Sequence, residues 1–155
     1  MSPVVLHVED AGAGADGATY EPADVALALE AAMARLDVAP EAEVSLVLTG
    51  DATLQDLNRA HRHVDEPTDV LSFAADPADW TPGEPPYLGD ILISVPQAAA
   101  GGRATGHPLA DELRLLAVHG LLHLLGHDDE TDAGAAEMER LEVELGVRRA
   151  DDVGE

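Results

Sequence analysis

Cysteine and lysine are both absent from the 155 residues of this chain. Without cysteine there can be no disulfide, no cysteine nucleophile and no zinc or iron–sulfur site with cysteine ligands. The basic residues are eight arginines. Aromatic residues account for only 3% of the chain, so a surface of aromatic rings that stacks nucleobases is not expected.

Positive charge is also scarce, because 31 acidic residues stand against eight basic ones and the net charge is −23. Such a charge repels phosphate, so we do not expect loose binding to bulk nucleic acid or to an anionic membrane, although a local basic pocket is compatible with it. The N-terminus lacks the basic region of a secretory signal. The longest apolar stretch, residues 113–126, is too short and too polar to span a bilayer. We therefore expect a soluble cytoplasmic protein that does not bind membranes.

The length suits one compact domain over residues 1–155, with a frayed tail from about residue 148. Short apolar or alternating stretches predict four strands, at Val4–Val8, Glu43–Thr49, Val70–Ala74 and Leu88–Ser94. Apolar residues at helical spacing, together with start and stop residues, predict helices over residues 23–36, 51–62, 108–125 and 132–145, and a short helix is expected over residues 96–102. The remaining long segments are a flexible connector at 11–19 and a surface loop, rich in proline and glycine, at 76–89.

Strands and helices mix without strict alternation, which predicts an α+β domain with a small mixed sheet of about four strands and helices packed on it. Pro108 is predicted to be the first residue of the longest helix, and Gly126 to end it. The last helix is predicted to turn one apolar stripe inward. This stripe consists of Ala136, Met138, Leu141 and Leu145.

Two histidines near the end of the longest helix, His119 and His123, are four residues apart. At about 100° per residue their side chains point within roughly 40° of each other, so both imidazoles can reach one ion at about 2.0–2.1 Å, the zinc–nitrogen distance. Gly126 lets the backbone leave the helix and turn back, so that a later donor can face the same ion. The candidates for this third ligand are Asp129 and His127. Three protein ligands with one open position are typical of a catalytic zinc, here at the C-terminal end of a central helix.

The residue after the first histidine argues against one class of metalloenzyme. Zinc peptidases with the H-E-x-x-H motif use the glutamate after the first histidine as general base, and here that position is Gly120. A bound ion could still lower the pKa of water towards ~7 and direct hydroxide at a phosphodiester. The alternative to a metal site is a pair of helix histidines that face a polar groove.

The most basic segment of the chain, residues 59–63 (RAHRH), lies at the end of a predicted helix. The planar guanidinium of arginine donates bidentate hydrogen bonds to phosphate, so this segment could hold a phosphodiester beside the metal. Favourable placement of cations at a helix C-terminus explains it equally well. Thr68, Asp69 and Ser72 are predicted as turn and capping residues before the next strand. Asp90 is predicted as a turn cap, with support of the site as the alternative.

Three segments carry a resemblance to a known family. They are LNxxxR at 57–62 running into PTDVLSF at 67–73, LGDI at 88–91, and HGxLHLxGxD at 119–128. In residue content, order and spacing they resemble the YbeY family of bacterial single-strand-specific metallo-endoribonucleases, over roughly residues 45 to 145. The resemblance implies one zinc ion, hydrolysis of RNA phosphodiesters, and a role in small-subunit (16S) rRNA 3′-end maturation and ribosome quality control. It also implies that Arg62 is the functionally important arginine of the family.

The chain departs from the family pattern at one position. The pattern H-x3-H-x5-H places its third histidine at position 129, where this chain has aspartate. Related metallohydrolase motifs accept aspartate there, and a carboxylate oxygen binds zinc at a similar distance. We therefore predict His119, His123 and Asp129 as the metal ligands, with His127 as the alternative third ligand.

The resemblance also implies partners. We expect the chain to act on rRNA and to dock on the ribosome or a ribosomal protein, and an assembly GTPase is a further candidate partner. Two other functions are kept as alternatives. One is a ribosome assembly factor without turnover, in which the metal only stabilises the fold, and the other is a metallopeptidase, which Gly120 disfavours.

Overall fold

The structure, a computed structural model, describes residues 3–9 and 19–148. Its strands are β1 (Val4–Val8), β2 (Glu43–Thr49), β3 (Val70–Ala74) and β4 (Tyr87–Ser94). Its helices are α1 (Pro22–Arg35), α2 (Asp51–Arg62), α3 (Val95–Thr105), α4 (Leu109–Leu124) and α5 (Asp132–Glu144), with a short 3-10 turn η1 (Pro77–Asp79). Most of the predicted connector at 11–19 and the predicted frayed tail beyond 148 lie outside the described residues.

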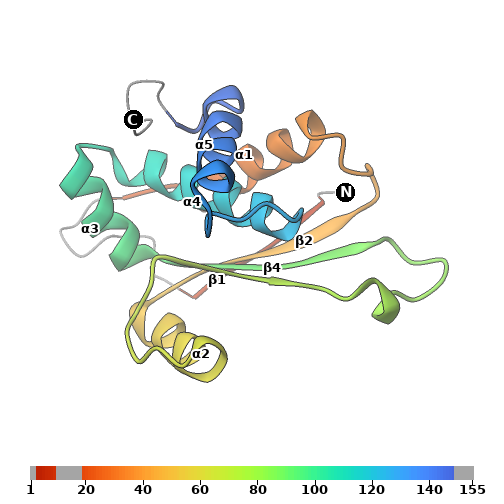
Figure 1. Cartoon of the computed structure of the whole chain (residues 1–155), viewed down its shortest axis with the longest axis horizontal. Coiled ribbons are helices and arrows are strands. Elements are labelled where there is room, and N and C mark those ends of the chain that lie inside the picture. The colour runs from red at the N-terminus through yellow and green to blue at the C-terminus, as the bar shows by residue number, and fades with distance from the viewer. Residues whose placement is uncertain (1–2, 10–18, 149–155) are drawn as a thin grey trace.

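The four strands form one mixed sheet in the order β1-β2-β4-β3. Strands β1, β2 and β4 run parallel to one another, and β3 pairs antiparallel with β4 at one edge of the sheet. Figure 1 shows α1, α4 and α5 on one side of the sheet and α2 on the other. This architecture confirms the predicted α+β fold with a four-stranded mixed sheet.

The core lies between the sheet and α4. Alternate residues of the two central strands are fully buried on this face, and the centre of α4 is apolar and buried opposite them. The largest of these fully buried side chains are Leu46, Leu48, Ile91, Ile93, Leu113 and Leu121. Each contributes about 1.5–3 kcal/mol by leaving water, so α4 is held firmly against the sheet. Among the described residues, no helix has the length and apolarity needed to cross a membrane.

The structure corrects three predicted boundaries. Pro108 is the N-cap of α4 rather than its first residue, because its ψ of 149° is extended. Helix α3 is longer than predicted, since it begins at Val95, after the Ser94 hydroxyl that accepts a hydrogen bond from the Gln97 backbone, and continues to Thr105. Strand β4 begins at Tyr87 and therefore shortens the predicted surface loop.

The predicted inner stripe of α5 is right only in part. Met138 is buried and Leu145 packs against the core, but Ala136 is exposed. Glu142, four residues after Met138 and therefore on the same helix face, is fully buried instead. An acidic side chain thus takes a place that the apolar pattern did not assign to it.

Candidate metal centre

Helix α4 ends in a Schellman motif, and this turn lies next to the two histidines of the candidate metal centre. Gly126 has a φ of +100°, a conformation that favours glycine. Its backbone N–H donates to the carbonyl of His123 at 3.0 Å, and the N–H of His127 donates to the carbonyl of Leu122 at 3.0 Å. The predicted helix end at Gly126 is therefore confirmed, and the chain turns back over the end of α4.

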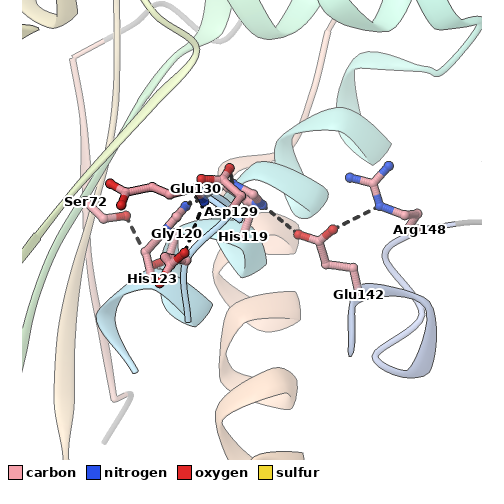
Figure 2. A network of polar contacts seen from close by, with 9 residues as sticks. Ser72, His119, Gly120, His123, Asp129, Glu130, Glu142 and Arg148 are labelled. Atoms are coloured by element: carbon pink, nitrogen blue, oxygen red, sulfur yellow. Dashed lines mark hydrogen bonds and ion pairs between the residues drawn. The ribbon is translucent and has the colours of Figure 1, made fainter. Parts of the chain in front are cut away.

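Local hydrogen bonds then fix the segment between α4 and α5. The Asp128 carboxylate accepts from the backbone of Glu130 at 3.1 Å, and the Thr131 hydroxyl caps α5 by accepting from Gly134 at 2.9 Å. A Cβ on Gly134 would lie 2.3 Å from the Asp128 carbonyl oxygen, so α5 starts in close contact with this segment. As a result, Asp129 is placed opposite the two histidines of α4 (Figure 2).

Three side chains bring one potential ligand atom each to a common point. Nε2 of His119 lies 3.1 Å from Nε2 of His123. Asp129 Oδ2 lies 3.6 Å from the first of these nitrogens and 4.0 Å from the second. Two ligand atoms at about 2.1 Å from a tetrahedral ion are roughly 3.4 Å apart, so the spacing suits one zinc-sized cation with two nitrogen ligands and one oxygen ligand. This group could hold a metal ion.

The far side of the His119 ring faces a buried carboxylate. Nδ1 of His119 lies 2.8 Å from Oε2 of Glu142, whose other oxygen accepts from Nε of Arg148 at 2.9 Å. Burial lowers the pKa of His119, but the hydrogen bond and charge of Glu142, aided by the charge of Asp129, outweigh burial and raise this pKa above its usual value of 6.5. Protonation of the His119 ring therefore competes with metal binding at this residue.

The three ligand candidates open onto a cleft of about 680 Å³ between the end of α2, β3 and the end of α4. The residues that line it include Arg62, Thr68, Asp69, Ser72, His119, His123, His127, Asp128, Asp129 and Glu130. Arg62 is the last residue of α2 and its side chain is exposed. Arg62 and His119 are 57 positions apart in the sequence, and the fold brings both to one cleft.

Comparison with known proteins identifies the family. A family model described as Endoribonuclease YbeY matches residues 19–148. The chain belongs to the YbeY family. This confirms the resemblance carried by the three sequence segments.

Individual relatives agree with this assignment. A Moorella thermoacetica protein named Endoribonuclease YbeY is 56% identical over 117 residues, which cover 72% of this chain and 75% of the relative. Proteins of the same name from Roseiflexus sp. and Paramagnetospirillum magneticum are 46% and 49% identical, covering 79% and 66% of this chain and 82% and 65% of the relatives. The solution structure of a Thermotoga maritima protein matches with a TM-score of 0.56 at 20% identity, over 91% of this chain and 86% of that protein, and supports the fold.

Gly120 is required by close packing in this member of the YbeY family. Its carbonyl oxygen accepts a hydrogen bond from the Ser72 hydroxyl at 3.1 Å. A Cβ at this position would lie 2.7 Å from Cγ2 of Ile91 and 2.9 Å from Oγ of Ser72. A glutamate therefore has no room here, and the position that supplies the base in H-E-x-x-H peptidases faces the sheet instead.

The structure changes the interpretation of four polar residues. Ser72 lies inside β3 and bonds to α4, and Thr68 and Asp69 line the cleft, so their predicted roles as turn and capping residues are too narrow. Asp90 is no turn cap, since it lies inside β4 and accepts a hydrogen bond from the Tyr87 hydroxyl. Burial, with this hydrogen bond, raises the pKa of Tyr87 to about 12.

We expect Asp129→Ala to weaken zinc binding by at least roughly tenfold, because even the loss of an outer-shell partner of a metal ligand costs 10–100-fold. Affinity is measured by competition with a chromophoric chelator. His127→Ala is the matched control, because His127 lines the cleft but does not belong to the converging group found among the described residues. Zinc loss in the His127 variant with retention in the Asp129 variant would assign the third ligand to His127.

Proposed function

We propose that this chain is a zinc-dependent, single-strand-specific endoribonuclease that acts in 16S rRNA 3′-end maturation and ribosome quality control. The observation that carries the proposal is the convergence of His119, His123 and Asp129 in a cleft that Arg62 also lines. The family names of the relatives supply the reaction class. We further propose that residues 1–155 form one metallohydrolase domain.

The charge of the cleft explains why a metal ion is needed. Four carboxylates line it, from Asp69, Asp128, Asp129 and Glu130, against a single arginine among the described lining residues. A phosphodiester would be repelled from such a surface. A divalent cation held by the two histidines and Asp129 offsets this negative charge at the place where phosphate must bind.

Each residue has a distinct role in the proposed reaction. When bound, zinc would lower the pKa of a water molecule towards ~7 and polarise a phosphoryl oxygen. His119, His123 and Asp129 would hold the ion with one coordination position open. The Arg62 guanidinium would hold the non-bridging phosphate oxygens by paired hydrogen bonds and offset the charge that develops on them during attack.

The overall charge bears on how the substrate is found. A net charge of −23 provides little long-range attraction for RNA, so affinity must come from the site itself or from a docking partner. We therefore propose that this chain reaches rRNA in the cytoplasm through the ribosome, by way of a ribosomal protein or an assembly GTPase.

The function is tested with purified protein on one labelled RNA presented as a single strand and as an annealed duplex. We expect cleavage of the single strand, little cleavage of the duplex, loss of cleavage after chelation and recovery on addition of zinc. Chelation that lowers the melting temperature while neither RNA is cut at any zinc concentration would favour the assembly factor without turnover. Equal cleavage with and without chelator would contradict the proposed metal dependence.

A further inference from the structure

Behind the candidate metal centre lies a chain of three hydrogen-bonded polar side chains, from Arg148 through Glu142 to His119 (Figure 2). Glu142 is fully buried on α5, and the side chain of Arg148 is 20% exposed. A buried carboxylate is costly unless it is paired and hydrogen-bonded. Both oxygens of Glu142 are used, one towards Arg148 and the other towards His119, so its burial serves these two contacts.

The contact to His119 determines which ring nitrogen can bind a cation. An ionised carboxylate only accepts hydrogen bonds, so Nδ1 of His119, 2.8 Å from Oε2 of Glu142, must carry the proton. In the neutral ring, Nε2 then keeps its lone pair. This nitrogen faces His123 and Asp129, at 3.1 Å and 3.6 Å. The carboxylate therefore presets both the tautomer and the ring orientation that metal binding needs.

The contact to Arg148 keeps the carboxylate in place. After α5 the chain turns at Gly146, whose φ is +79°, and the backbone N–H groups of Val147 and Arg148 donate to the Glu142 carbonyl oxygen at 3.1 Å and 3.2 Å. This turn brings the Arg148 guanidinium against the Glu142 carboxylate, with Nε of Arg148 2.9 Å from Oε1 of Glu142. This hydrogen bond holds the carboxylate of Glu142 on the side of α5 that faces Nδ1 of His119.

On this geometry we infer that Glu142 is a positioning residue for the metal centre, and that Arg148 supports it. The inference rests on the proposed function, because it concerns the His119 ligand. It extends the site from the end of α4 to α5 and the turn that follows. A purely structural role would be different, since Glu142 would then join α5 to its own C-terminal turn and the metal affinity would not depend on it.

Two measurements on Glu142→Gln separate these roles. In metal-free protein, 15N NMR of the His119 ring should show loss of the preference for a proton on Nδ1. In a chelator competition, zinc affinity should fall about 10–100-fold, the usual cost of losing an outer-shell partner. Glu144→Gln is the matched control, because Glu144 is exposed at the end of the same helix, and it should change neither readout. Glu142→Asp, which keeps the charge, should recover part of the affinity.

A second variant covers the case in which Glu142→Gln does not fold. Arg148→Gln leaves Glu142 intact and should weaken zinc affinity several-fold, whereas Arg140→Gln, at an exposed pair with Glu137, should not. Wild-type zinc affinity in a folded Glu142→Gln protein, with the proton still on Nδ1, would overturn the inference and leave the proposed function standing. A wild-type protein that binds no zinc would overturn both.

Discussion

Replacing His123 with alanine is expected to abolish zinc binding and RNA cleavage together. Its Nε2 lies 3.1 Å from that of His119, so the substitution removes one of the three donors that converge in the cleft. A bound ion supplies several kcal/mol of transition-state stabilisation, and ~4 kcal/mol corresponds to ~10³-fold in rate. Zinc content is measured by elemental analysis, and cleavage by single-turnover kinetics on labelled single-stranded RNA.

A matched histidine far from the cleft serves as control. His7 lies on β1, at the opposite edge of the sheet from β3, so His7→Ala should retain zinc and cleave normally. Because a ligand that binds the folded state stabilises it, chelation should lower the melting temperature of the wild-type protein but not that of the His123 variant. If the His123 variant lost its zinc and still cleaved RNA at the wild-type rate, the cleavage would have to arise from another site.

The local parts of the site follow from the sequence because they depend on one helix and its end. The spacing of His119 and His123 fixes their common face, and the free backbone conformation of Gly126 allows the return of the chain. The convergence of Asp129 needs only the few residues that follow. The strands could be predicted from the sequence equally well, since each is a short apolar stretch between turn residues.

The features of the site that depend on contacts between distant residues could not be predicted from the sequence in the same way. Glu142 contacts His119 across 23 residues, and its residue type does not distinguish it from the other acidic residues of the same helix. Its one sequence signal is its position four residues after Met138, on the inner face. Ser72 bonds to α4 and Asp69 lines the cleft because β3 pairs antiparallel beside β4, an arrangement that the strand pattern alone does not specify.

Replacing Arg62 with alanine is expected to lower kcat/KM for single-stranded RNA by roughly 10²–10³-fold, the usual cost of removing one donor that stabilises charge in a transition state. Zinc affinity should stay unchanged, because Arg62 is not among the converging ligand candidates. Arg62→Lys should recover only part of the rate, since an ammonium keeps the charge but not the planar pair of donors. Cleavage kinetics and chelator competition on the same protein preparations measure both quantities.

The neighbouring Arg59 provides the control, because it lies on the same helix but pairs with Asp56 and Asp65 at 3.1 Å and 3.6 Å outside the cleft. Arg59→Ala should therefore leave kcat/KM near the wild-type value, which separates a local contact with phosphate from a general loss of positive charge. Equal losses in the two variants would instead indicate that α2 acts through its overall charge. The effect of salt decides the same question, since a general electrostatic contribution weakens steeply as ionic strength rises, whereas a contact inside the cleft is screened less.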